Sequence, residues 1–376
     1  MFLKEEERIE TLKACRDCPM CHMTDTVAFI TGSESNTPRG RAMTLWGLEK
    51  GLLSWESEGV QRILYQAFLD GLAREWCEGH YDHDELVLDG RRRLVEKGLG
   101  PPVVARVSRN LQESGNPWGK PEEPLTSLVE AAGAKIRSSP EVVVYFGSAA
   151  RVERISAARA LVQVLDRMED SFEILEKEPD SGFLSYQLGD FPSAARQAQH
   201  LTALLSRCRA KRLLVLGGCD FRMISTRYGR LGASLPKGME ILHVSEFLQQ
   251  RMEQKRLTFA RTIDRKVTYH DPCALARFTY VLDPPRKILT ELAGSNFTEM
   301  EFHGKKALPC GGCGGVPFTD PEISERAARL RIDEALRRRA EILASADPGC
   351  EVHLAQAARG TPLFVQNLAE LILQAM

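Results

Sequence analysis

Pro309-Cys-Gly-Gly-Cys-Gly-Gly315 is the stretch from which the organisation of this chain can be worked out, because it sets two cysteines among four glycines. Glycine tolerates positive φ and carries no side chain, so Gly311, Gly312, Gly314 and Gly315 can bring backbone N–H groups close to a bound group. N–H donors aimed at the sulfurs of a metal centre stabilise its more negative, reduced form. A flexible turn would explain the glycines but not the cysteines between them. The stretch therefore predicts a metal-binding loop.

The whole sequence of 376 residues holds ten cysteines, at positions 15, 18, 21, 77, 208, 219, 273, 310, 313 and 350. The first residues are charged and lack the apolar run of a secretory signal, so we expect a cytoplasmic protein. Because the cytosol keeps thiols reduced, clustered cysteines there indicate metal or redox chemistry rather than disulfides. The formal net charge of -1 gives no basic field for nucleic acid, and no apolar stretch approaches the ~20 residues of a membrane span.

Cys15-x2-Cys18-x2-Cys21 is the tightest group, and three thiolates at this spacing are typical of a 4Fe-4S cluster. Zinc is the alternative, although zinc sites usually place their ligands as pairs across a longer loop. The fourth ligand is expected at Cys77, because the segment that begins there resembles the end of a second ferredoxin run. Asp25 stands where the fourth cysteine of the first run would serve the other cluster. The upstream positions that would ligate a second such cluster are Ala67, Asp70 and Ala73. The chain has thus kept every ligand of one cluster and lost every ligand of the other.

The sequence predicts an α+β fold, with a helical N-terminal part followed by short strands that alternate with amphipathic helices. The segments with helical spacing are Thr44–Lys50, Gln61–Trp76, Arg91–Lys97 and Pro321–Ala340. The predicted strands are Val142–Phe146, Leu213–Leu216, Ile241–Val244, Val267–His270 and Ala307–Leu308. Between the two parts, Ser114–Pro124 is rich in proline and glycine and is interpreted as a linker.

An internal repeat divides the second part. His243-Val-Ser-Glu-Phe-Leu248 aligns with Asn367-Leu-Ala-Glu-Leu-Ile372 at an offset of 124 residues, and the strand before Ser148 aligns with the strand before Cys273. We therefore expect two repeated α/β, Rossmann-like halves. The expected divisions are a helical domain at 1–113, a linker at 114–139, a first half at 140–256 and a second half at 257–376.

Three motifs give the chain a resemblance to a known family: Tyr269-His-Asp-Pro-Cys-Ala-Leu-Ala-Arg277, Pro285-Arg-Lys-Ile-Leu289 and the Pro309–Gly315 stretch. The chain resembles iron–sulfur subunits that have duplicated cysteine-rich CCG domains. These include the iron–sulfur subunits of glycolate oxidase, of anaerobic glycerol-3-phosphate dehydrogenase and of heterodisulfide reductase. Thr37-Pro-Arg-Gly40 and Asn116-Pro-Trp-Gly119 resemble the ferredoxin-like domain of that family. The resemblance implies a ferredoxin-like domain followed by two CCG halves.

The family pattern is a Cys, a Cys-Cys-Gly and a Cys-x-x-Cys in each half, and this chain departs from it. In the first half these positions read Ser148, Asp180-Ser181-Gly182 and Cys219-Asp-Phe-Arg222, so this half is cysteine-depleted and is not expected to bind metal. In the second half, Asp347-Pro-Gly-Cys350 keeps only one cysteine of its pair, and Cys310 has lost its cysteine neighbour.

The thiols left in the second half are Cys273, Cys310, Cys313 and Cys350. Four thiolates suit a second 4Fe-4S cluster, with zinc or an empty site as the alternatives. The larger non-cubane clusters that the reductase resemblance suggests need the adjacent cysteine pair that is missing here. His270 and His303 are reserve ligands, although packing roles are preferred for both. Cys208 and Cys219 are interpreted as small core residues.

The resemblance implies an electron-transfer component of an oxidoreductase complex, without catalytic residues of its own. It would relay single electrons through two 4Fe-4S clusters between a flavoprotein dehydrogenase and another carrier. The sequence has no glycine motif for nucleotide binding, so a flavin would belong to a partner chain. Two alternatives stay open: a catalytic heterodisulfide or thiol reductase at the second cysteine set, and a zinc-binding scaffold subunit.

Overall fold

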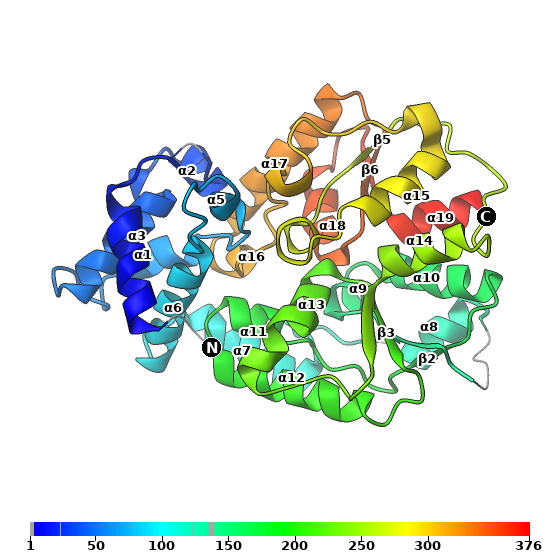
Figure 1. Cartoon of the computed structure of the whole chain (residues 1–376), viewed down its shortest axis with the longest axis horizontal. Helices are drawn as coiled ribbons and strands as arrows, with labels where there is room; N and C mark the ends of the chain where they lie inside the picture. The colour runs from blue at the N-terminus through cyan, green and yellow to red at the C-terminus, as the bar shows by residue number, and fades with distance from the viewer. Residues whose placement is uncertain (1–3, 23, 123, 135–138) are drawn as a thin grey trace.

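The computed structural model describes residues 4–22, 24–122, 124–134 and 139–376, and its N-terminal helices lie to one side of two separate parallel sheets (Figure 1). Apolar residues one or two turns apart, such as Leu86 and Leu94, turn toward a shared core and are almost fully buried. The helices on this side are α1 (Glu5–Asp17), α2 (Thr26–Thr31), η1 (Glu34–Asn36), α3 (Pro38–Glu49), α4 (Glu58–Tyr65), α5 (Leu72–Glu75), α6 (His83–Glu96) and α7 (Pro102–Ser114).

The predicted helices Thr44–Lys50 and Arg91–Lys97 are confirmed within α3 and α6, but the prediction of a continuous helix over Gln61–Trp76 is wrong. Residues 66–71 form a loop between α4 and α5, in which Leu69 has φ 52° and Gly71 has φ 78°. Tertiary contacts outweigh the local helical pattern here, because carbonyl groups of this loop accept hydrogen bonds from buried arginines.

The first sheet has four parallel strands in the order β2-β1-β3-β4, which is a Rossmann-like arrangement with helices on both faces. Its strands are β1 (Val142–Tyr145), β2 (Phe172–Ile174), β3 (Arg212–Val215) and β4 (Glu240–His243). Its helices are α9 (Ser148–Val152), α10 (Ile155–Arg167), α11 (Phe183–Gln187), α12 (Phe191–Leu205), α13 (Gly218–Arg222), η2 (Met223–Arg227), η3 (Tyr228–Leu231) and α14 (Val244–Glu253).

The second sheet has three parallel strands in the order β5-β6-β7, and Phe297 adds a single bridge to β5. Its strands are β5 (Val267–Tyr269), β6 (Ile342–Ser345) and β7 (Phe364–Asn367). Its helices are η4 (Ala274–Thr279), α15 (Asp283–Ala293), η5 (Gly294–Asn296), η6 (Gly304–Lys306), α16 (Val316–Thr319), α17 (Pro321–Arg337), α18 (Pro348–Ala357) and α19 (Leu368–Ala375).

Most of the predicted strands are confirmed to within a residue or two, and the exception is Ala307–Leu308. Ala307 instead ends the short helix η6, and its carbonyl oxygen accepts a hydrogen bond from Arg277 at 2.7 Å. The predictions also omitted β2 and β7. Both strands are at a sheet edge and carry charged or amide residues, so their apolar alternation is weak.

The two segments aligned at an offset of 124 residues occupy matching places in the structure. Asn367 and His243 each cap the helix that follows the last strand of their sheet, and in both helices a glutamate three residues later accepts from the cap N–H. The halves also pack symmetrically, because α10 lies against α19 while α14 lies against α15. Two similar α/β units therefore face each other across a pseudo-two-fold axis.

The described residues of the segment 114–139 form more than a simple linker. It contains helix α8 (Leu125–Ala131), whose Leu125, Leu128 and Val129 are buried. The Asn116 side chain is fully buried and donates hydrogen bonds to the carbonyl groups of Ser114 and Lys120. In the described part of the chain, no helix has both the length and the apolar character needed to cross a bilayer.

Candidate metal centres

The structure brings together the four predicted thiols of the first set. Cys15 lies in the last turn of α1, Cys18 directly follows that helix, Cys21 lies in the next turn, and Cys77 comes two residues after α5. Burial raises the pKa of Cys15 to about 12, with further contributions from Cys77, Cys21 and Cys18. Burial also raises the pKa of Cys21 to about 11, again with contributions from Cys77 and Cys18. The four thiols are thus close enough to repel each other as anions, and a bound cation would relieve that repulsion.

The positions where a second ferredoxin-type cluster would have been ligated now surround a cavity of about 20 Å³. Its lining includes Asp25, Ala67, Asp70 and Ala73, the four positions at which the sequence lacks cysteine. Asp25 caps α2 through the N–H groups of residues 27 and 28 and forms an ion pair with Arg41 at 2.5 Å. A cavity of this size holds about one water molecule. Polar contacts have taken the place of the lost cluster.

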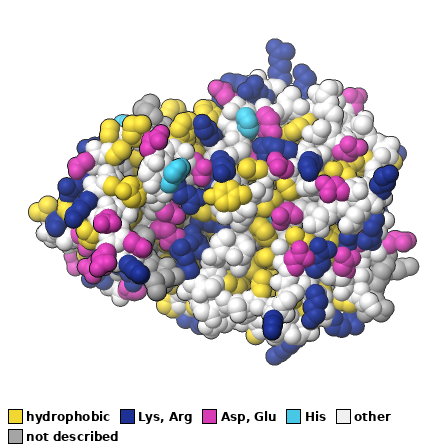
Figure 2. Space-filling model, viewed as in Figure 1, with side chains coloured by type: hydrophobic (Ala, Val, Ile, Leu, Met, Phe, Trp, Pro, Cys, Tyr) yellow, Lys and Arg dark blue, Asp and Glu magenta, His cyan; other side chains and the backbone are white. Residues whose placement is uncertain are grey.

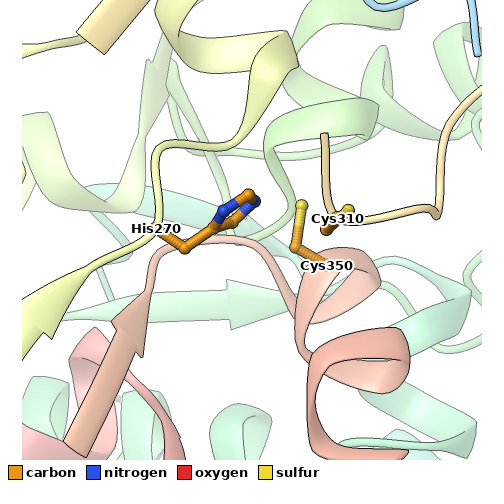
Figure 3. Close-up of side chains that lie close together, drawn as sticks. All are labelled: His270, Cys310 and Cys350. Atoms are coloured by element: carbon orange, nitrogen blue, oxygen red, sulfur yellow. The ribbon is translucent and has the colours of Figure 1, made fainter. Parts of the chain in front are cut away.

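The second predicted set lies at the carboxyl ends of the second sheet's strands, the edge where α/β folds bind ligands. Cys273 follows β5, Cys350 lies in α18 after β6, and Cys310 and Cys313 belong to the loop before α16; all four are buried. The Sγ atoms of Cys273 and Cys313 are 2.8 Å apart. Cys310 and Cys350 lie with His270 in a group whose ligand atoms are all within 4.8 Å of one another (Figure 3). The structure therefore brings this set together too.

Cys219 joins this second set, and its interpretation as a small core residue was incomplete. Contact with Cys219 is the main reason that the pKa of Cys313 lies well above its ordinary value. Cys219 also lines a cavity of about 100 Å³ together with Cys310, Cys313 and Cys350. The sequence held only a partial signal for this role, since its alignment with the family pattern put Cys219 at a ligand position of the first half, whereas the structure places Asp220 at the position of Cys350.

The glycines of the Cys310–Gly315 loop explain its close packing. Gly311 has φ 84°, and a Cβ there would overlap the carbonyl of Ser324. Gly314 has φ 69° and lies equally close to the carbonyl of Ala67. The Gly312 N–H lies 3.4 Å from Cys310 Sγ, as expected for a donor to a sulfur, whereas the Gly314 N–H donates to Gln187. Gly315 also has positive φ and precedes α16.

His270 is placed to donate a hydrogen bond to this group of thiols. Its Nδ1 atom accepts from Arg331 Nε at 3.3 Å, so in the neutral ring the proton is on Nε2. Nε2 is buried and has no hydrogen-bond partner within the described residues. Burial and the neighbouring Arg331 and Arg277 hold the pKa of His270 well below its usual range, which keeps the ring neutral. His303 is exposed and bonds to the Met300 carbonyl, so the structure leaves it outside the set.

The surroundings of the second set favour an anionic metal centre. Contact with Cys313, together with burial, raises the pKa of Cys273 well above its ordinary value. Contact with Cys310 does the same for Cys350. Buried thiols of this kind lose their protons when a metal binds. Arg277 and Arg331 are fully buried beside the set, so positive charge is already in place for the thiolates. The residues present, including the unpartnered His270 Nε2, therefore suit an iron–sulfur cluster.

The equivalent place in the first half is built from oxygen rather than sulfur. Ser148 Oγ donates to Asp180 at 2.9 Å, and Ser181 Oγ donates to Asp220 at 2.5 Å. Burial raises the pKa of both carboxyl groups. Hydrogen-bonded serine and aspartate side chains therefore stand here in place of thiols.

The structure corrects the alignment of the two halves at these positions. Gly182 packs against Ala194, the fourth residue of α12, and Gly311 packs in the same way against Ser324, the fourth residue of α17. This match aligns Ser181 with Cys310. Asp220 and Cys350 each come five residues after the last residue of the central strand. The Ser181–Asp220 hydrogen bond therefore occupies the place of the Cys310–Cys350 contact.

Comparisons with known proteins agree with the chemistry of these sites. Residues 267–355 match the cysteine-rich domain family CCG. The chain is 30% identical to one of the subunits of the dihydromethanophenazine:CoB–CoM heterodisulfide reductase of Methanosarcina mazei, over 81% of this chain and 76% of that protein. It is 36% identical to an uncharacterized iron–sulfur protein of Methanococcus maripaludis, over 92% of this chain and 68% of that protein.

Two further matches extend the comparison. The chain is 25% identical to the EtfAB:quinone oxidoreductase of Syntrophomonas wolfei, over 80% of this chain and 45% of that protein. A crystal structure of a hypothetical protein from Helicobacter pylori matches with a TM-score of 0.54 and 10% identity, covering 100% of this chain and 73% of that one. At that identity the likeness concerns the fold alone.

Proposed function

Because this chain belongs to the family of iron–sulfur subunits with cysteine-rich CCG domains that includes the heterodisulfide reductase protein of Methanosarcina mazei, we propose that it is an electron-transfer subunit of a cytoplasmic oxidoreductase complex. The observation that carries the proposal is the presence of two separate thiol sets, one among the N-terminal helices and one at the second sheet. We propose that each set holds a 4Fe-4S cluster, which accepts and passes single electrons when bound.

The loop 66–71 supports a relay between the two sets. It comes shortly before Cys77 of the first set and packs directly on the Cys310–Gly315 loop of the second. Arg91 joins the two loops, since its guanidinium donates to the carbonyl groups of Ala67 and Gly314. Such close backbone contact keeps the distance between the sets fixed, which electron transfer requires.

Exposed apolar side chains beside the first set support a partner protein there. Met20 lies between Cys18 and Cys21 and is 62% exposed, while Trp76 precedes Cys77 and is 40% exposed. Figure 2 shows yellow apolar groups on this end of the molecule. Apolar side chains that stay exposed beside a proposed cluster site are available for contact with another protein. We propose that an oxidoreductase partner, in particular a flavoprotein, docks here and exchanges electrons with the first set.

The proposal is tested by a reductive titration of anaerobically purified protein, followed by EPR. A relay takes up about two electrons per chain, one for each cluster, and returns them to an added oxidant without net chemistry. A protein that shows no reducible signal would overturn the relay. The substitutions M20E and W76E should slow reduction by a partner flavoprotein while leaving reduction by dithionite unchanged.

A second candidate is a reductase for a disulfide or thiol substrate at the second set. The cavity of about 100 Å³ that borders four of these cysteines favours it, because its lining extends beyond the thiols to side chains that cluster binding does not need. These include the aromatic side chains of Trp118, Phe146, Phe183 and Phe318. A disulfide would take two electrons and two protons and leave as two thiols. Turnover of a disulfide by the isolated chain with an artificial electron donor would favour this candidate over the relay.

A further inference from the structure

Helix α13 of the first half reaches across to the second thiol set. Gly218, its first residue, lies so close to η4 that a Cβ there would come within 2.9 Å of Leu275 Cγ. The Cys219 N–H donates to Asp347 Oδ2 at 3.3 Å, and the same carboxyl oxygen lies 3.8 Å from Cys350 Sγ. Close glycine packing and this hydrogen bond fix α13 against the half that carries the other four thiols.

The thiol of Cys219 lies within the set rather than beside it. It contacts Cys313, and Cys313 in turn lies 2.8 Å from Cys273. It is also near enough to Cys350 to raise the pKa of that thiol. Cys219 therefore connects the pair Cys273–Cys313 with the pair Cys310–Cys350, and five thiols from two different halves form one group.

Arg222, the last residue of α13, brings a positive charge to the same place. Its side chain is 3% exposed, lies 3.2 Å from the centroid of the Phe278 ring and donates to the Leu69 carbonyl at 3.4 Å. In residues 4–376, apart from those left undescribed, it forms no ion pair. Burial and the neighbouring Arg227 lower the pKa of Arg222, while Cys273, Asp84 and Cys313 act in the opposite direction.

A buried cation without a counter-ion is costly, so the arrangement needs a negative charge close by. Arg277 and Arg331 differ from Arg222, because Arg277 forms an ion pair with Asp70 and Arg331 forms one with Glu334. Asp84 acts on Arg222 without forming an ion pair with it, and thiolates holding a metal cluster are the further negative charge that its neighbours can supply.

We propose that Cys219 and Arg222 complete the second cluster site from the opposite half. Cys219 is a thiolate ligand that takes one of the four ligand positions of the cluster in place of one of the other four thiols, and Arg222 is the counter-charge. The cysteine-depleted first half then acts as part of the binding site of its partner half. This inference rests on the proposed function, but different results would overturn the two. Wild-type protein without iron would overturn the proposed function, whereas the variants below test the inference in iron-loaded protein.

The first test compares C219S with C208S, in which a half-buried cysteine outside both sets is changed. We expect C219S to lose iron and sulfide or to change the EPR signal of the second cluster, with the signal of the first cluster kept as the check on folding. C208S should match the wild type in both measurements. Iron content and spectra of C219S that equal those of the wild type would overturn the role of Cys219.

The second test measures the reduction potential of the second cluster in R222Q and R222K. A positive charge stabilises the more negative reduced cluster, so R222Q should lower the reduction potential. R222K keeps the charge and should have a potential close to that of the wild type. The potential of the first cluster serves as the internal control. Equal potentials in R222Q and wild-type protein would overturn the role of Arg222.

Discussion

Single buried polar groups identify the second site more clearly than any motif does. His270 Nε2 has no partner among the described residues, and its proton is fixed by the Arg331 hydrogen bond to Nδ1. Burial of an unpaired donor costs about 1–3 kcal/mol, a cost that is removed when a sulfur anion accepts. The sequence suggested His270 as a reserve ligand, but it could not show which ring nitrogen carries the proton, because Arg331 lies 61 residues away along the chain.

We predict that H270L lowers the reduction potential of the second cluster. The N–H donor stabilises the reduced cluster more than the oxidised one, so its loss lowers the potential by less than about 130 mV, the one-electron equivalent of a full hydrogen bond of about 3 kcal/mol. Protein-film voltammetry measures this shift. H270Q retains an N–H donor and is the matched control, with a smaller shift. An unchanged potential in H270L would show that Nε2 does not face the cluster.

Asp84 gives a prediction for the pH dependence of stability. Its carboxyl group accepts the Gly71 N–H at 2.7 Å, and burial, with Asp82 and Asp70 nearby, raises its pKa from 3.8 to about 7. Because the folded pKa lies above the unfolded one, the stabilisation is complete below about pH 4 and is lost as the pH rises through 7.

D84N should therefore have a higher Tm than the wild type at pH 8, and the difference should disappear toward pH 4. Thermal unfolding of both proteins across this range gives the comparison. The exposed Asp333 provides the control D333N, which should follow the wild-type curve. A constant difference between D84N and wild type at every pH would contradict the assignment.

At the scale of elements, the loop 66–71 shows why a local pattern failed. The spacing of apolar residues predicted one helix over Gln61–Trp76. Arg91 instead donates hydrogen bonds to the carbonyl groups of Leu64 and Ala67, at 2.9 and 2.7 Å. It also binds the carbonyls of Gln187 and Gly314, which belong to the other two parts of the chain. No periodicity encodes a partner 223 residues away, so the break in the helix could not be predicted from sequence. The long helices with regular apolar spacing and the buried strands could be predicted from sequence.

We predict that R91M destabilises the whole chain by about 3–5 kcal/mol, because several buried carbonyl groups would lose their donor. Urea unfolding followed by circular dichroism measures the change. The neighbouring R92M removes only ion pairs at the partly exposed surface, with Asp89 and Glu96, and should cost less than about 1 kcal/mol. Similar losses in both variants would mean that Arg91 does not join the parts of the chain.

At the scale of the whole molecule, duplication has produced two unlike halves. The repeat was visible in the sequence through His243 and Asn367, and the structure confirms it through matching capping boxes and symmetric helix packing. The sequence did not show that Cys219 crosses the interface, because the closeness of the two halves is a tertiary property. It also misaligned Cys310 by one position, since a glycine-rich stretch has no side-chain pattern to fix the register.

The most direct test of the account is the amount of iron, acid-labile sulfide and zinc per chain in anaerobically purified protein. Two 4Fe-4S clusters predict about eight iron and about eight sulfide with no zinc, and EPR signals of two clusters after reduction by dithionite. About four iron would contradict a cluster at the second set. Zinc alone, or no metal, would contradict the electron-transfer function as a whole.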